Sequence, residues 1–202
     1  IKKIGVIGAG QMGNGITHVF ARAGYNVRIL DSNVNAIEAG LVKINANMER
    51  EVKRGQMEAV DKAEAMARIE TSSSYADFFD CQLVVEAATE DEIIKKSILL
   101  ELCNHIPDDT IIASNTSSIS ITRLGAHTGR PGKFVGMHFM NPVPRMELVE
   151  IIRGIATDET TYTLIKELTV KLGKTPVSAE DFPAFIVNRI LLPMINEAVY
   201  TL

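Results

Sequence analysis

The N-terminal segment of the chain reads IKKIGVIGAGQMGNGITHVFARAGYNVRILD and permits few folds. An apolar run at residues 4–7 enters a glycine-rich turn at residues 8–13, and a helix-like segment follows as far as Gly24. A second apolar run, at residues 27–30, ends in Asp31. Because short apolar runs bounded by turns are typical of buried strands, the segment predicts a strand, turn, helix and strand with an acid at its far end.

The spacing of the glycines favours a dinucleotide-binding turn. Gly8 would make the tight turn, Gly10 would let the backbone approach a pyrophosphate, and Gly13 would let the helix pack closely on the strand. Gln11 and Met12 lie at the helix N-terminus, where free N–H groups and the positive end of the helix dipole attract phosphates. Such a motif alone is weak, but here a strand, a helix and a later acid surround it, which favours the dinucleotide interpretation over an ordinary turn.

The acid at the end of the second apolar run indicates which dinucleotide binds. Asp31 can accept hydrogen bonds from both ribose hydroxyls, whereas its charge would repel a 2′-phosphate. The nearby cation Arg28 could offset this repulsion, but it lies inside the strand. The sequence therefore predicts NAD rather than NADP as the cofactor.

Composition excludes several classes of partner. The formal net charge of −4 gives no support to nucleic-acid binding. No apolar run approaches the length of about 20 residues that a membrane span needs, so we expect no membrane partner. Cys81 and Cys103 lack the spacing of metal ligands, so we expect no metal site and interpret both as reduced thiols of a cytoplasmic protein.

Apolar runs and helical patterns alternate along the rest of the chain, which predicts an α/β fold with an open, doubly wound sheet. Ligands bind beyond the carboxyl ends of the strands in such sheets, so residues 87–90 and 115–118 should lie at the binding edge. The expected helices cover about 33–54, 58–67, 92–105 and 160–172, with a short one beginning near 119–124. The expected strands cover 69–71, 80–87, 110–114, 134–139, 148–152 and 174–178.

The pattern changes at residues 181–183. Residues 185–200 predict one strongly apolar helix with a kink at Pro193. So apolar a helix needs a covering surface, which either a further helical domain or another chain would supply. We therefore expect a dinucleotide-binding domain at 1–181, followed at 182–202 by the first helix of an incomplete, truncated helical domain.

Three polar residues near the predicted binding edge are candidates for catalysis, although each also has a structural explanation. Ser117 could cap a helix, and His138 could be a hydrogen-bonded core histidine. Glu150 lies between Val149 and Ile151, where a buried carboxylate needs a partner. The economical partner is His138, whose imidazole the carboxylate would orient. Such a base could take the proton of an alcohol while hydride leaves carbon for the cofactor.

Four motifs carry a resemblance to a known family. They are GAGQMGNG at 8–15, ASNTSS at 113–118, HFMNPVP at 138–144 with LVE at 148–150, and PAFIVNR at 183–189. In this order they resemble the L-3-hydroxyacyl-CoA dehydrogenase family, and within it the short bacterial enzymes that act on 3-hydroxybutyryl-CoA. The resemblance spans nearly the whole chain. It implies a Rossmann domain followed by a helical domain that forms a homodimer and closes over acyl-CoA.

The same resemblance implies roles for individual residues. His138 is expected to be the catalytic acid and base and Glu150 its partner, while Ser117 and Asn188 hydrogen-bond the 3-hydroxy or 3-keto oxygen. The implied NAD site adds Asp31, Glu90, Lys95, Ser117 and Asn141. The family also places CoA contacts on the helix after the second strand, which indicates Asn47, Lys53 and Arg54. A charged helix face there could equally be merely solvated.

These patterns support one main hypothesis and two alternatives. The main hypothesis is NAD-dependent oxidation of short-chain L-3-hydroxyacyl-CoA, such as 3-hydroxybutyryl-CoA, to the 3-ketoacyl-CoA and the reverse. An alternative in the same class is a dehydrogenase of free hydroxy acids of the L-gulonate type. An alternative from a different class is an NAD-binding module without turnover, because a fold alone does not establish a function.

Overall fold

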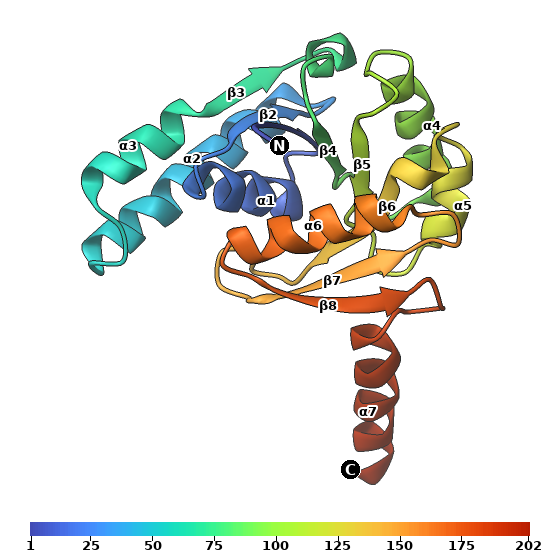
Figure 1. The fold of residues 1–202 in the computed structure, drawn as a ribbon. Coiled ribbons are helices and arrows are strands. Elements are labelled where there is room, and N and C mark those ends of the chain that lie inside the picture. The colour runs from blue at the N-terminus through green and yellow to red at the C-terminus, as the bar shows by residue number, and fades with distance from the viewer.

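A computed structural model describes residues 1–202 and contains one eight-stranded sheet with helices on both faces (Figure 1). The strand order is β3-β2-β1-β4-β5-β6-β7-β8. All neighbouring strands are parallel except β6 and β7, which are antiparallel. The predicted doubly wound α/β fold is confirmed. None of the helices combines the length and hydropathy that a membrane crossing requires.

The N-terminal segment forms the predicted strand, turn, helix and strand. Strand β1 covers Lys3–Ile7, helix α1 covers Gln11–Arg22, and strand β2 covers Asn26–Leu30. Gly8 adopts a φ of +102°, which favours glycine, and its N–H donates to the Leu30 carbonyl at 2.7 Å. This bond holds the turn at the carboxyl ends of β1 and β2.

A helical hairpin follows and extends beyond the sheet (Figure 1). It consists of α2 at Val34–Lys53 and α3 at Ala59–Ala67, and the chain then returns to the sheet as β3 at Ile69–Ser72. The Asn33 side chain caps α2 by accepting the Asn35 N–H, in agreement with the expected start of the helix.

The middle of the chain supplies the next three strands. Strand β4 covers Leu83–Glu86, α4 covers Glu92–Cys103, β5 covers Ile111–Ser114, α5 covers Ile121–Ala126, and β6 covers Phe134–Phe139. The predicted strands at 80–87 and 110–114 are therefore slightly longer than the observed ones. Two short 3₁₀ helices join these elements, η1 at Tyr75–Phe78 and η2 at Pro131–Lys133.

The C-terminal part completes the sheet and then leaves it. Strand β7 covers Leu148–Arg153, α6 covers Glu159–Lys171, and β8 covers Thr175–Glu180. Helix α7, at Val187–Thr201, continues through Pro193 and contains no buried residue. Figure 1 shows it projecting away from the sheet, at the red end of the chain.

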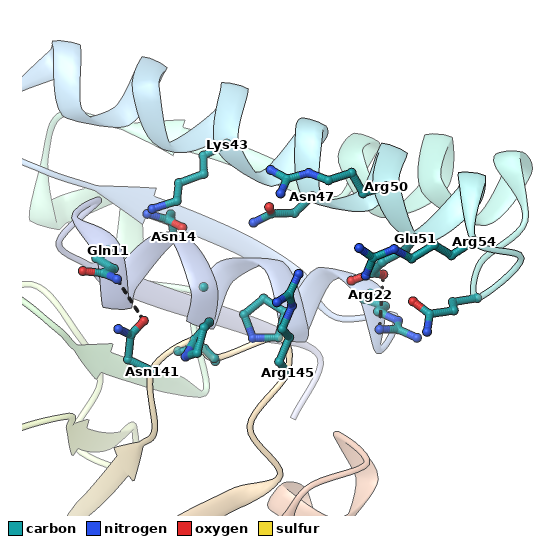
Figure 2. A pocket seen from close by; sticks show the side chains of 15 residues that line it. Gln11, Asn14, Arg22, Lys43, Asn47, Arg50, Glu51, Arg54, Asn141 and Arg145 are labelled. Carbon is teal, nitrogen blue, oxygen red and sulfur yellow. Dashed lines mark hydrogen bonds and ion pairs between the residues drawn. The ribbon is translucent and has the colours of Figure 1, made fainter.

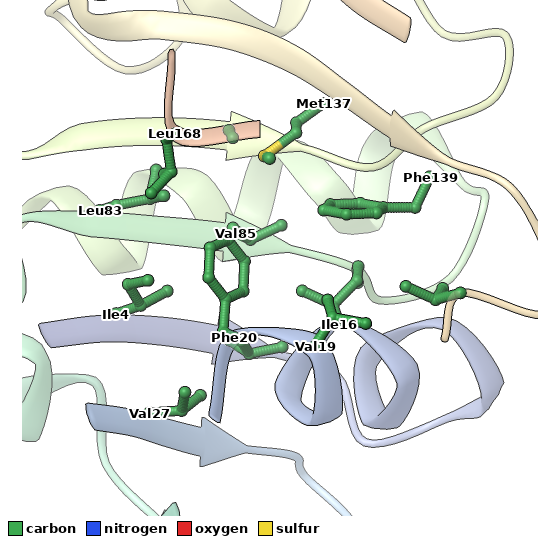
Figure 3. Close-up of a cluster of buried hydrophobic side chains, with 14 of the residues drawn as sticks. Ile4, Ile16, Val19, Phe20, Val27, Leu83, Val85, Met137, Phe139 and Leu168 are labelled. Carbon is green, nitrogen blue, oxygen red and sulfur yellow. The ribbon is translucent and has the colours of Figure 1, made fainter. Parts of the chain in front are cut away.

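Each face of the sheet has its own hydrophobic core. The larger one joins α1, α2 and α6 to the sheet, and Figure 3 shows Phe20 of α1 among the side chains of the central strands. Phe20 contacts Phe139 of β6 edge to face, with ring centroids 6.4 Å apart. The second core lies under α4 and α5 and includes Leu99, Leu124 and Phe134. Helices cover both faces, so the central strands are almost wholly apolar.

The link between β8 and α7 is tied to the second core by Asp181. Its carboxylate accepts hydrogen bonds from Ser120 Oγ at 2.7 Å, from the Ile121 N–H at 2.9 Å and from the Thr122 N–H at 2.8 Å. Burial raises the pKa of Asp181, but these hydrogen bonds outweigh it and hold the pKa below the ordinary value of 3.8. Asp181 therefore caps α5 from a distance in sequence of about sixty residues.

Replacing Asp181 by alanine is expected to lower the free energy of unfolding by about 1–2 kcal/mol at neutral pH, because two N–H groups lose a charged acceptor. A group with a depressed folded pKa stabilises above its unfolded pKa, so the difference from wild type should shrink as pH falls below 3.8. Urea unfolding at several pH values measures it. Asp158→Ala is the matched control, because Asp158 precedes α6 without making a side-chain cap. Equal losses in the two variants would contradict the capping role.

Candidate active site

The glycine turn leaves room for a ligand at one position and none at another. A Cβ atom added to Gly13 would lie 1.7 Å from the Gly8 carbonyl oxygen, so this glycine is required for packing. A Cβ atom added to Gly10 would meet no atom within 4 Å. Gly10 thus faces open space at the N-terminus of α1, where a pyrophosphate can approach the backbone. The turn has the form that a dinucleotide requires.

The Asp31 carboxylate lies beside this turn. Its Oδ2 atom accepts the Ala9 N–H at 2.7 Å, and its Oδ1 atom accepts the Asn33 N–H at 2.9 Å. Each oxygen keeps a second lone pair with which it can accept a ribose hydroxyl. Arg28 points elsewhere and pairs with Glu70 at 2.6 Å, so it does not offset the charge of Asp31.

Glu90 organises the loop that follows β5. Its Oε1 atom accepts hydrogen bonds from Thr116 Oγ1 at 2.7 Å and from the N–H and Oγ of Ser117 at 2.7 and 3.0 Å. Burial raises the pKa of Glu90, but these bonds and the nearby charge of Lys95 hold the pKa below its ordinary value. Ser117 does not cap α5; Ser120 does, by accepting the Arg123 N–H.

The structure brings His138 and Glu150 together. They lie opposite each other on the antiparallel strands β6 and β7, with His138 Nδ1 2.7 Å from Glu150 Oε2. Glu150 has no exposed surface, and its Oε1 atom accepts the N–H groups of Ile186 and Val187, both at 2.9 Å. Burial raises the pKa of Glu150, but the hydrogen bonds from His138 and the two N–H groups hold the pKa below its ordinary value.

These contacts determine which imidazole nitrogen is free. An ionised carboxylate only accepts hydrogen bonds, so Nδ1 of His138 must carry the hydrogen that it donates to Glu150. The Nε2 atom is then the one that can take or give a proton. His138 is buried beside Phe185, with the two ring centroids 6.1 Å apart.

Helix α7 brings Asn188 to the same place. Its Nδ2 atom donates to the Ser117 carbonyl oxygen at 3.1 Å. The start of α7 is itself held by Glu150, so this carboxylate connects His138 with the position of Asn188. The four residues His138, Glu150, Ser117 and Asn188 come from β6, β7, the loop after β5 and α7.

A further contact joins the glycine turn to the loop after β6. Gln11 Nε2 donates to Asn141 Oδ1 at 3.0 Å. Asn141 follows His138 by three residues, so the glycine turn and the end of β6 face the same region. This is the region in which the sequence predicts the cofactor.

Lys95, which the resemblance assigns to the NAD site, has a buried side chain. Its side chain is 1% exposed, and its Nζ atom is held by both carboxylate oxygens of Glu86 at 2.7 and 2.8 Å. The Lys95 side chain therefore lies beneath the surface at the carboxyl end of β4. Glu86 was not among the residues predicted from the sequence, although an acid at the end of the apolar run LVVE indicates a buried partner in the same way as Glu150.

A cleft of about 870 Å³ lies between α1, α2 and the loop at 141–145 (Figure 2). Its wall carries five cations and one acid, Glu51, and contains a single hydrophobic residue. The cations are Arg22, Lys43, Arg50, Arg54 and Arg145. Of the three residues predicted to contact CoA, Asn47 and Arg54 line this cleft. Lys53 does not: its side chain is 73% exposed and lies 4.0 Å from Glu49.

The fold and the glycine turn define a dinucleotide-binding domain of the dehydrogenase type. Residues 3–182 match the family model described as "3-hydroxyacyl-CoA dehydrogenase, NAD binding domain". The chain belongs to the 3-hydroxyacyl-CoA dehydrogenase family, which confirms the resemblance seen in the sequence. The cofactor of this domain is NAD.

Named relatives agree with this assignment. The chain is 55% identical to the 3-hydroxybutyryl-CoA dehydrogenase of Bradyrhizobium diazoefficiens, over all of this chain and 69% of the relative. It is 46% identical to a probable 3-hydroxybutyryl-CoA dehydrogenase of Bacillus subtilis, over 99% of this chain and 70% of the relative. The crystal structure of (S)-3-hydroxybutyryl-CoA dehydrogenase PaaH1 from Ralstonia eutropha superimposes with a TM-score of 0.96 at 46% identity, over 98% of this chain and 70% of that one.

Proposed function

We propose that this chain catalyses the NAD-dependent oxidation of short-chain L-3-hydroxyacyl-CoA, such as 3-hydroxybutyryl-CoA, and the reverse reduction. The observation that carries the proposal is the enclosed pair of His138 and Glu150, 2.7 Å apart, at the sheet edge that also holds the glycine turn. The names of the relatives support the choice of substrate. A carboxylate buried in a sheet and hydrogen-bonded to a histidine is suited to acid–base chemistry.

In this proposal each residue of the site has a separate task. His138 takes the proton of the 3-hydroxyl group through Nε2 and returns it in the reverse direction. Glu150 keeps the imidazole in the required tautomer and orientation by accepting the Nδ1 hydrogen. Ser117 and Asn188 hydrogen-bond the substrate oxygen. NAD, when bound, supplies the acceptor for the hydride that leaves the carbinol carbon.

The cofactor contacts in this proposal follow the sheet edge. The pyrophosphate lies against the backbone of Gly8, Gly10 and Gly13 and the adjoining residues Gln11 and Met12. Asp31 accepts the ribose hydroxyls, and its charge disfavours NADP. Glu90, Ser117 and Asn141 complete the site, whereas Lys95 acts from behind it.

The cationic cleft fits the CoA part of the substrate. CoA carries a 3′-phosphate and a pyrophosphate, and guanidinium groups bind phosphates through charge-assisted hydrogen bonds. Arg54 and Asn47 are the contacts that sequence analysis indicated, and Arg50 lies on the same wall (Figure 2). A free hydroxy acid has no phosphate groups that the five cations of the cleft could bind. The cleft therefore favours the CoA thioester over a substrate of the L-gulonate type.

Helix α7 supports a proposal about organisation. Residues 1–181 form the dinucleotide-binding domain, and 182–202 begin a helical domain, because β8 ends at Glu180 and nothing in α7 is buried. Its large apolar side chains, such as Ile190, Leu192 and Ile195, are exposed and suit a homodimer contact.

The two cysteines support a cytoplasmic location, because both are free thiols. Burial raises the pKa of Cys81 to about 12, so this thiol stays protonated.

The test is the oxidation of NADH with acetoacetyl-CoA and with acetoacetate, on this chain and on one extended to the length of its relatives. We expect turnover of the thioester in the extended chain.

Arg54→Gln should raise the KM for acetoacetyl-CoA about tenfold, because one charge-assisted contact to phosphate is lost. Lys53→Gln is the matched control, since it lies beside Arg54 but outside the cleft. NADH binding without any hydride transfer would instead favour a non-catalytic module, and equal rates on the free acid would contradict the CoA assignment.

A further inference from the structure

An enclosed ion pair lies at the carboxyl ends of β4 and β5 and takes no direct part in the mechanism above. Glu86 has no exposed surface and Lys95 is 1% exposed, and the two side chains form a salt bridge of 2.7 Å. Lys95 Nζ donates to both carboxylate oxygens of Glu86, and Ser114 Oγ and the Ala88 N–H donate to the same carboxylate at 2.7 and 2.8 Å. Four hydrogen bonds therefore converge on one buried acid.

Stability alone is a weak explanation for such a pair. Apolar residues of similar volume often replace a buried ion pair with no loss of stability, because two charges must be removed from water. The surroundings of Glu86 offer a better explanation. Its bond to Ala88 fixes the turn at 87–90, and that turn packs directly on Gly8: a Cβ atom added to Gly8 would lie 2.5 Å from the Ala87 carbonyl oxygen.

The pair also reaches the residues that face the ligand. Lys95 Nζ lies 3.8 Å from Glu90 Oε2. The other oxygen of Glu90 accepts both the N–H and the hydroxyl of Ser117. A continuous path of charge and hydrogen bonds thus runs from Glu86 through Lys95 and Glu90 to Ser117, and it links the loops after β4 and β5.

We propose that Glu86 and Lys95 are positioning residues, which hold Glu90 in place so that Glu90 can orient the Ser117 hydroxyl. This inference rests on the proposed function, in which Glu90 and Ser117 belong to the cofactor site. The ammonium of Lys95 attracts Glu90 from behind, and Glu86 fixes that ammonium. The Ser117 hydroxyl donates to Glu90, so its own oxygen remains an acceptor for a ligand hydroxyl.

The test uses the double variant Glu86→Gln/Lys95→Met, which removes both charges at similar volume and leaves no unpaired charge in the core. Single variants would leave one buried charge unpaired and lose stability for that reason alone. We expect the double variant to melt near wild type but to bind NADH about tenfold more weakly, because small displacements of positioned groups have large effects. Fluorescence titration with NADH measures the affinity. The control is Glu92→Gln/Lys96→Met, a partly exposed pair 2.8 Å apart on the same helix, whose Glu92 also contacts Arg123.

A second measurement tests the route through Glu90. In a Glu90→Gln background the double variant should cause no further loss of NADH affinity, because the link that it acts through is already broken. An undiminished tenfold loss there would overturn the proposed route. Unchanged NADH affinity in the double variant would overturn the positioning role. If the wild-type chain itself fails to bind NADH, the proposed function fails first and the inference fails with it.

Discussion

Replacing His138 by glutamine is expected to lower kcat for the reduction of acetoacetyl-CoA by about 100- to 10,000-fold, the usual range for the loss of a general acid or base. Glutamine retains a polar group beside Glu150 but cannot exchange a proton at working pH. NADH binding should remain, because none of the glycine-turn contacts involves the imidazole. Steady-state kinetics together with NADH titration separate the two effects.

The chain offers a matched control for this prediction. His105 follows the end of α4 and lies 3.1 Å from Glu101 of that helix, so it forms a histidine–glutamate pair of the same type without the enclosure. His105→Gln should leave kcat unchanged. Turnover that survives in His138→Gln at the wild-type rate would refute the catalytic assignment, whatever the cofactor affinity proves to be.

Two glycine-to-alanine changes in the glycine turn are expected to affect different properties: one prevents folding and the other weakens NADH binding. Gly13→Ala should prevent normal folding, because the new methyl group would lie 1.7 Å from the Gly8 carbonyl oxygen and neither backbone can move independently. Gly10→Ala should melt like wild type, since the site is open and its φ of −63° suits any residue. It should nevertheless weaken NADH binding at least about tenfold, because the methyl group occupies the approach to the backbone.

Thermal melts and NADH titrations of both variants check this contrast. A Gly13→Ala protein that melts at the wild-type temperature would contradict the packing role of that glycine. Unaltered NADH affinity in Gly10→Ala would show that no part of the dinucleotide comes near the turn.

Much of the fold was predictable because the chain gives consistent local signals. The apolar runs around Val6, Val85 and Ile112 are short and continuous, as strands covered on both faces require. Asn33 predicted the start of α2 because its side chain can accept a free N–H group of the first helical turn. The ends of strands were less accurate, because a strand ends where its hydrogen bonds to neighbouring strands end, and a single sequence does not reveal those neighbours.

The candidate site was predictable where a polar residue interrupts an apolar run. A buried Glu150 required a partner, and His138 lay within reach on the neighbouring strand β6, so burial predicted their pairing. Glu86 was predictable in the same way, because a buried carboxylate also needs a partner there, and Lys95 is enclosed because it is that partner. Asp181 could not be found in this way, since it follows the last strand and its partners on α5 are about sixty residues away.

The single carboxylate of Glu150 serves the imidazole with one oxygen and the first amides of α7 with the other. Anyone who grafts this histidine–glutamate pair into another dinucleotide-binding scaffold must therefore also transplant the segment at 184–188. Without this segment, Glu150 Oε1 would lose both of its N–H donors. The carboxylate beside the imidazole would then be buried with only half of its hydrogen bonds. The smallest transferable unit is a hairpin of β6 and β7 together with the entrance to the last helix.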